Sequence, residues 1–218
     1  MITNNIFQHR IQALDVPIDK KEVYRYLGFS INTQKKEFLP EIDFLIEKSI
    51  KEMHSIIHAQ GLYRCFPLKK DDSKQIPEIS FEKYKIQSTY LYKNLKNCSH
   101  VVLFAATIGP QVDALIRRYI KLDAAKAAIL QATGAMFTES YVDILNQEIS
   151  LWAKSEGFLT NRRFSPGYGD VDLINQKIFF SVLPCTQKIG LTLTDSLVMA
   201  PEKSVTGFIG LYKNISYS

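Results

Sequence analysis

The densest group of features that could bind a ligand lies in residues 162–170. Arg163 offers a planar guanidinium that can pair with a carboxylate through two hydrogen bonds. Pro166 has a fixed φ angle, while Gly167 allows a positive φ and close approach to the backbone. Tyr168 adds a flat aromatic face with a polar tip. Taken alone, these nine residues are more economically interpreted as a plain connection between two elements.

A second candidate is Glu139, which lies within an alanine-rich stretch from residue 123 to about residue 152. The spacing of apolar residues predicts a long helix here. At 100° per residue, Glu139 lies about 60° from Val142, on the side of Ala128 and Ala132. These small neighbours leave room beside a carboxylate. From the helix alone, an acid that points at solvent is the more economical interpretation, because buried acids are rare.

Residues that bind metals or act as nucleophiles are few and dispersed. Cys65, Cys98 and Cys185 are far apart and form no CxxC pair, which argues against a zinc site or a disulfide framework. His54 and His58 have the i, i+4 spacing of a metal-binding helix, but no Glu follows His54 as HExxH requires. We therefore expect no metal site and no catalytic side chain.

Composition is that of an ordinary globular protein, with 46% hydrophobic and 22% charged residues in a chain of 218. The net charge of +5 is scattered, without a basic stripe interleaved with aromatics. This favours an acidic protein partner over nucleic acid. No apolar run reaches the roughly 18 residues of a membrane span, and the first residues lack a signal-peptide layout. We expect a cytoplasmic protein that does not bind membranes.

The order of the expected elements indicates one α+β domain over residues 1–218, with an N-terminal helical part at about 1–62 and a core at about 79–213. Residues 65–77 are expected to form a loop, and either Asp170 or Asp172 to cap the helix at 173–183. The strand, glycine and helix at 101–110 lack the GxGxxG of a nucleotide fold. Helices are expected at 20–27, 40–58, 110–119, 123–152 and 173–183, and strands at 79–88 (with 90–92 as a candidate continuation after a turn), 101–107, 191–197 and 204–211.

Several short motifs follow one another in the last third of the chain, and together they are more specific than any one alone. They are Arg163-x-x-Pro166-Gly167-Tyr168, a helix with Gln176, Ile189-Gly190-Leu191-x-Leu193-Thr194-Asp195-Ser196, Met199-x-Pro201 and Ser204-Val205-Thr206-Gly207. In this order and spacing the sequence resembles the activation (reactivation) domain of cobalamin-dependent methionine synthase, over about residues 100–210. The Gly-Tyr-Gly-Asp version of the loop, followed by Gln176, is similar to free-standing members of that family.

The resemblance implies an α+β domain built on a twisted antiparallel sheet flanked by helices, and it implies binding of S-adenosylmethionine. In the parent system, the activation domain holds S-adenosylmethionine over cobalamin that has oxidised to cob(II)alamin. A flavodoxin-like donor reduces the cobalt, and methyl transfer restores methylcobalamin. A free-standing copy would supply this step in trans, in methionine biosynthesis, to a synthase that lacks its own activation domain. It would then be the reactivation component of a methyltransferase, and the cobalamin would be carried by the partner.

The same resemblance implies roles for six residues. Arg163 corresponds to the arginine that contacts the carboxylate of the ligand, and Glu139 to a helix acid near its amino group. Tyr168 corresponds to the tyrosine near the methyl-bearing sulfonium, which a π face can stabilise. The remaining three correspond to the loop that lines the ligand and offers main-chain atoms, namely Ser165, Pro166 and Gly167.

Two departures from the family pattern keep other interpretations open. Residues 169–172 are Gly-Asp-Val-Asp where fused domains carry a Pro-Ala-Cys-Pro type of run, and residues 1–60 contain no convincing match to a ligand-binding aspartate. The alternative is a non-catalytic partner-binding module of a corrinoid methyltransferase system, with weak or no S-adenosylmethionine binding. A third interpretation, an ordinary methyltransferase with a small-molecule acceptor, lacks a glycine-rich strand–helix motif.

Overall fold

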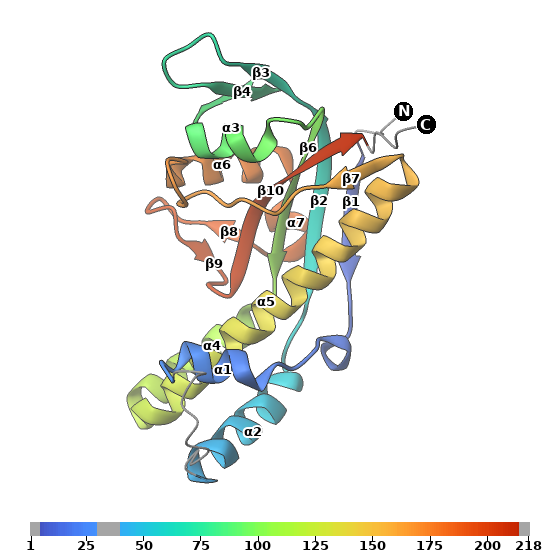
Figure 1. Cartoon of the computed structure of the whole chain (residues 1–218). Coiled ribbons are helices and arrows are strands. Elements are labelled where there is room, and N and C mark those ends of the chain that lie inside the picture. The colour runs from blue at the N-terminus through green and yellow to red at the C-terminus, as the bar shows by residue number, and fades with distance from the viewer. Residues whose placement is uncertain (1–4, 30–39, 214–218) are drawn as a thin grey trace.

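A five-stranded antiparallel sheet forms the centre of the computed structural model, which describes residues 5–29 and 40–213 (Figure 1). The strands lie in the order β1-β2-β6-β10-β7. Their bounds are Ile6–Arg10 for β1, Gln60–Pro67 for β2, His100–Thr107 for β6, Ser204–Lys213 for β10 and Phe158–Thr160 for β7. All four pairs of neighbours are antiparallel, so the predicted α+β fold with a twisted antiparallel sheet is confirmed.

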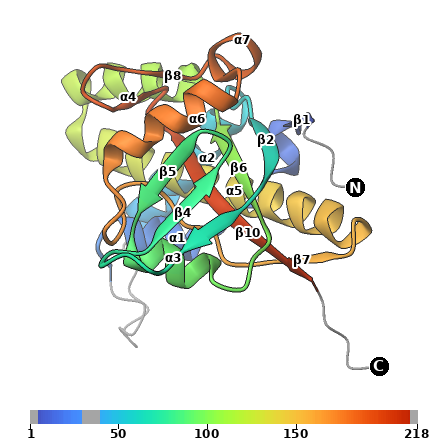
Figure 2. The same ribbon diagram turned by 90° about the horizontal axis from the view of Figure 1, so that it is seen from above.

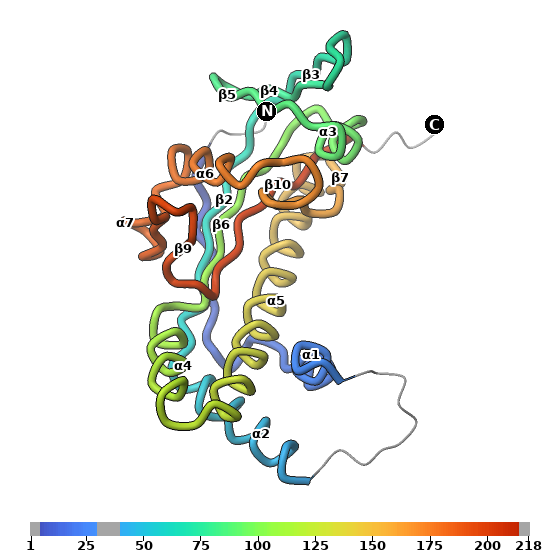
Figure 3. Tube along the Cα trace, turned by 90° about the vertical axis from the view of Figure 1, so that its left-hand side faces the viewer, coloured from blue at the N-terminus to red at the C-terminus, as the bar shows by residue number. Residues whose placement is uncertain are grey.

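The central strand β6 is apolar from Val101 to Ala106 because both faces of the sheet are covered. Successive side chains of a strand point to opposite faces. The side chains of β6 accordingly belong alternately to two hydrophobic clusters. Figure 3 shows α5 (Ala124–Ser155) and α1 (Lys20–Tyr26) on one side of the sheet, and α6 (Gln176–Val182) and α7 (Cys185–Ile189) on the other. The first cluster takes Val102, Phe104 and Ala106 of β6, and the second takes Val101, Leu103 and Ala105.

The helices that cover the first face begin where local capping signals predict. Asp123 precedes α5 and its side chain accepts a hydrogen bond from the Lys126 amide at 3.0 Å. Proline is the first residue of both α2 (Pro40–His54) and α4 (Pro110–Leu122). Near the start of the chain, Ala13–Asp15 forms the short 3-10 helix η1. None of the helices in residues 5–29 and 40–213 combines the length and hydropathy that crossing a membrane requires.

The second face carries shorter elements. Figures 1 and 2 show a small three-stranded sheet, β3-β4-β5, at the top of the molecule beyond the end of β2. Leu91 and Leu95 of α3 join the second cluster with Phe179 of α6. The remaining bounds on this side are Lys69–Asp71 for β3, Glu78–Phe81 for β4, Tyr84–Gln87 for β5, Thr89–Leu95 for α3, Leu173–Asn175 for the 3-10 helix η2, Thr192–Leu193 for β8 and Met199–Ala200 for β9.

Several sequence-based expectations of strands, loops and helices were wrong. The N-terminal part is not purely helical, because β1 pairs along its length with β2, residue 6 opposite residue 64. The expected loop at 65–77 contains the end of β2 and all of β3. The single strand expected at 79–88 is the hairpin of β4 and β5, and residues 90–92 are helical in α3. The strand expected at 191–197 is reduced to the two residues of β8.

Asp170 caps a different helix from the one expected. Its carboxylate accepts hydrogen bonds from the Ser88 hydroxyl and from the Thr89 and Tyr90 amides, at the start of α3. Asp172 caps the following segment instead, with its side chain accepting from the Ile174 amide at 3.0 Å. Although burial alone would raise the pKa of Asp170, the three donors at α3 lower it. The loop at 165–172 is therefore tied to a helix that lies far away in sequence.

We predict that Asp170→Ala lowers the free energy of unfolding by about 0.5–1 kcal/mol at pH 7, the lower half of the range for capping residues, since the carboxylate is exposed. Folding lowers this pKa, so the stabilisation is complete above the ordinary aspartate pKa of about 3.9 and is lost as pH falls through the lowered value. Urea denaturation at pH 7 and pH 3 measures the difference. Asp195→Ala, which removes an exposed carboxylate elsewhere, is the control; an equal loss in both variants would contradict the capping role.

Candidate ligand-binding site

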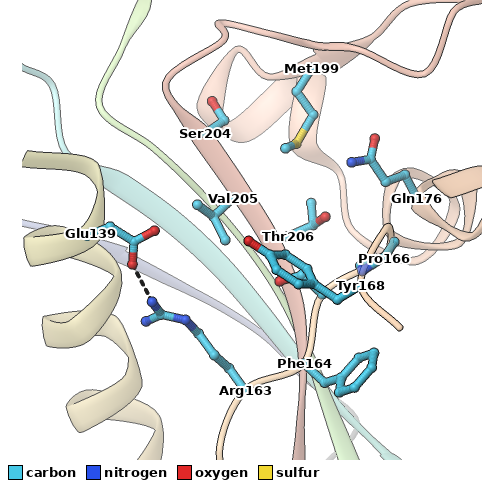
Figure 4. A pocket seen from close by; sticks show the side chains of 11 residues that line it. Glu139, Arg163, Phe164, Pro166, Tyr168, Gln176, Met199, Ser204, Val205 and Thr206 are labelled. Atoms are coloured by element: carbon cyan, nitrogen blue, oxygen red, sulfur yellow. Dashed lines mark hydrogen bonds and ion pairs between the residues drawn. The ribbon is translucent and has the colours of Figure 1, made fainter. Parts of the chain in front are cut away.

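A pocket of about 420 Å³ lies between α5, the loop that follows β7, the start of α6 and the start of β10 (Figure 4). Five of the six residues predicted from the sequence line it. Gly167 does not. The complete lining is Glu139, Arg163, Phe164, Ser165, Pro166, Tyr168, Gln176, Met199, Ser204, Val205 and Thr206.

The loop is aligned with the sheet by a pair of backbone hydrogen bonds to β10. The Phe164 amide donates to the Phe208 carbonyl at 2.9 Å, and the Phe208 amide donates to the Phe164 carbonyl at 2.7 Å. Gly207 permits this approach, since a Cβ there would lie 2.7 Å from the Phe104 ring and 3.3 Å from the Phe164 carbonyl oxygen. Phe164 packs on the second hydrophobic cluster, and Arg163, its neighbour in the extended segment, points the other way, toward α5 (Figure 4).

At the α5 side of the pocket, Arg163 is held by two acids. Glu139 and Asp143 stand one helical turn apart on α5 and therefore share a face. The Arg163 guanidinium donates through Nη2 to Glu139 and through Nη1 to Asp143 at 2.8 Å. The side chains of Arg163 and Glu139 are 28% and 39% exposed. Burial and the negative charge of Glu139 raise the pKa of Tyr26 on α1, so the charge of this carboxylate is felt beyond its ion pair.

The turn after Arg163 has a rigid backbone. Pro166 is buried. Gly167 has a φ of +89° and donates its amide to the Val171 carbonyl at 2.8 Å, so its function is to let the chain turn. The Tyr168 amide donates to the Ser165 carbonyl at 3.3 Å. This turn leaves the Tyr168 side chain 71% exposed, with its ring across the pocket in front of Thr206 (Figure 4).

Gln176 lines the pocket at the side away from α5, and the sequence reasoning assigned it no binding role. It is the first residue of α6 and only 7% exposed, and its Oε1 has no hydrogen-bond partner among the described residues. A buried carbonyl without a partner costs about 1–3 kcal/mol. In the sequence, only the position of Gln176 among the ordered motifs indicated that it could lie at the site. The motifs also contained, without an assigned role, Met199, Ser204, Val205 and Thr206, which line the pocket, and Phe164 stands inside the first of them.

The pocket thus has a charged end and an uncharged polar end. Glu139 and Arg163 form the first, and Gln176 with Met199 forms the second, while Tyr168 and Thr206 lie between them (Figure 4). No group of three His, Cys, Asp or Glu side chains able to hold a metal ion occurs in residues 5–29 and 40–213. The lining has the chemistry of a binding site for an organic molecule that carries opposite charges at one end.

Comparison with solved structures supports the fold. The chain superposes on the crystal structure of the MetH reactivation domain bound to AdoHcy with a TM-score of 0.67. The match has 13% sequence identity and covers 98% of this chain and 80% of that one. At this identity the similarity is one of fold. None of the curated protein sequences matches the chain significantly.

Comparison with protein families identifies the chain more directly. The family described as "Vitamin B12 dependent methionine synthase, activation domain" matches residues 59–217, well over half of the sequence. The matched range includes β2, β6, β10 and every residue that lines the pocket. The chain therefore belongs to the family of activation domains of vitamin B12-dependent methionine synthase.

Proposed function

We propose that this protein binds S-adenosylmethionine in the pocket and acts in trans as the reactivation subunit of a cobalamin-dependent methionine synthase that lacks its own activation domain. The observation that carries the proposal is the meeting of Glu139 and Arg163 at one end of the pocket. They offer one negative and one positive group side by side. The amino acid end of S-adenosylmethionine offers the complementary pair, an ammonium and a carboxylate.

Exchange of the protein ion pair for the ligand conserves charge. The ligand ammonium takes the place of Arg163 against Glu139, and the ligand carboxylate takes the place of Glu139 against Arg163. Asp143 keeps its hydrogen bond to Nη1 and holds the guanidinium in place. Because Arg163 is 28% exposed, its hydrogen bonds are partly shielded from water and a charge-assisted pair is stronger than on an open surface.

The rest of the pocket suits the remainder of the ligand. Its volume of about 420 Å³ is within the usual range for small-molecule sites. The face of Tyr168 lies across the space where a sulfonium would sit next to an amino acid anchored at Glu139, and a cation over a ring gains about 0.5–2 kcal/mol. Ser165 and Pro166 line the same side. The bound AdoHcy of the MetH reactivation domain, which shares this fold, has the same amino acid and nucleoside ends.

S-adenosylmethionine supplies an electrophilic methyl group, and reduced cobalamin on the partner, with an electron from a flavodoxin-like donor, is the acceptor. The residues of this chain bind and orient. Arg163 and Glu139 hold the amino acid end, and Tyr168 faces the sulfonium. No general base is needed on this chain, so its contribution to the rate is positioning. The proposed setting is methionine biosynthesis in the cytoplasm.

One observation favours the alternative, a non-catalytic module that binds a partner of a corrinoid methyltransferase system. Arg163 already donates two of its five N–H groups to carboxylates, so a ligand carboxylate has to compete with Glu139 and Asp143 for the guanidinium. The two functions differ in a direct test. A synthase deprived of its activation domain is mixed with this protein, flavodoxin, its reductase and S-adenosylmethionine.

We predict that this mixture, with NADPH as the electron source, converts cob(II)alamin on the synthase to methylcobalamin with release of S-adenosylhomocysteine, and that leaving out this protein abolishes the recovery. Absorbance of the cobalamin measures its return to the methylated form. A stable complex with the synthase that gives no recovery, together with no heat on titration with S-adenosylmethionine, would favour the non-catalytic module.

We predict that Arg163→Ala weakens binding of S-adenosylhomocysteine at least about tenfold, because a charge-assisted pair with the ligand carboxylate is lost. Isothermal titration calorimetry on the purified chain measures it. Arg162→Ala is the matched control, since Arg162 is exposed and does not line the pocket. Unchanged affinity in Arg163→Ala would remove Arg163 as the anchor.

We predict that Glu139→Gln also weakens S-adenosylhomocysteine binding about tenfold, because an amide cannot neutralise the ligand ammonium. Binding of a ligand without the amino group is expected to change less than about twofold. Asp143→Asn, one turn away on α5, is the control. This variant is expected to keep the wild-type preference for S-adenosylhomocysteine over the ligand without the amino group. Equal losses for both ligands in Glu139→Gln would show that Glu139 acts only through Arg163.

A further inference from the structure

We propose that Gln176 selects the base of the bound ligand, with its carboxamide hydrogen-bonded to the edge of an adenine ring. This inference rests on the proposed binding of S-adenosylmethionine and adds the residue that distinguishes its nucleobase. Four observations carry it: the burial of Gln176, its unpaired oxygen, its direction and its neighbours.

Gln176 has no structural role that accounts for its polarity. It stands at the start of α6, yet no side chain caps that helix. The residue is 7% exposed, and its Oε1 is buried and meets no donor among the described residues. Buried carboxamides in proteins are normally hydrogen-bonded. The unpaired oxygen of Gln176 therefore either destabilises the fold or forms its hydrogen bond with a ligand.

The direction of the Gln176 side chain also fits a contact with the base of the ligand. Figure 4 shows the amide nitrogen of Gln176 directed toward the space between Met199 and Thr206, with the oxygen beside it. Glu139 and Arg163 lie on the opposite side, beyond Tyr168 and Val205. A ligand whose amino acid end pairs with Glu139 and Arg163 therefore brings its nucleoside end to Gln176.

The chemistry favours the base over the ribose. A glutamine amide presents a donor and an acceptor side by side, and adenine presents an adjacent amino donor and ring-nitrogen acceptor that match them. Met199 lies beside Gln176, and thioethers make favourable contacts with the edges of aromatic rings. An adenine ring can hydrogen-bond to the Gln176 amide and also pack against Met199, whereas a sugar hydroxyl can only form the hydrogen bond.

A double-mutant cycle between protein and ligand tests the assignment. Calorimetry on the full chain compares S-adenosylhomocysteine with the analogue whose purine lacks the 6-amino group. The wild type is expected to bind the analogue about tenfold more weakly, while Gln176→Met, similar in volume but apolar, binds the two ligands within about twofold of each other. Lys177→Met, the exposed neighbour on α6, is the control and keeps the tenfold ratio.

Several results would overturn the inference. If the wild type binds S-adenosylhomocysteine and Gln176→Met keeps the wild-type ratio, Gln176 does not contact the base, although the proposed function survives. The same conclusion follows if the variant loses discrimination against a 2′-deoxyribose analogue instead. A lower melting temperature with equal losses for both ligands would show a purely structural role; removal of an unpaired amide is expected to leave the melting temperature unchanged or higher. No binding to the wild type would reject both proposals together.

Discussion

The reciprocal backbone hydrogen bonds between Phe164 and Phe208 are the constraint on which the rest of the site depends. They extend the pairing of β10 beyond β7 and fix the register of the loop against a strand that is itself paired with β6. In an extended segment this register decides which side chain faces which side. Phe164 enters the second hydrophobic cluster, and Arg163 turns toward α5. A shift of one residue would exchange the two and remove the cation from the pocket.

The pocket joins parts of the protein that lie on both faces of the sheet. Helix α5 supplies the carboxylate of Glu139 from the first face, and α6 supplies Gln176 from the second. The loop between them is secured at both ends, by β10 at Phe164 and by α3 at Asp170. The backbone that carries these groups needs little reorganisation when a ligand arrives, and the proposed change is the exchange of the Arg163–Glu139 pair for ligand pairs. This arrangement suits the positioning role that we propose for the pocket.

Local signals allowed part of this structure to be predicted, and nonlocal contacts explain the remainder. The capping aspartate at 123 and the prolines at 40 and 110 act within one helical turn, so their helices were placed correctly. Strand β1 was missed because its stability comes from pairing with β2, some fifty residues away. The motif order led to five residues that line the pocket. It did not single out Gln176, whose burial in the pocket lining follows from the packing of α6 on the sheet.

A crystal structure of the protein grown with S-adenosylhomocysteine tests the central claim most directly. The account predicts that the ion pair between Arg163 and Glu139 is replaced by two new pairs, ligand carboxylate with Arg163 and ligand ammonium with Glu139, while Arg163 keeps Asp143. Ligand density elsewhere, or a pocket free of ligand with the Arg163–Glu139 pair intact at saturating concentration, would contradict it.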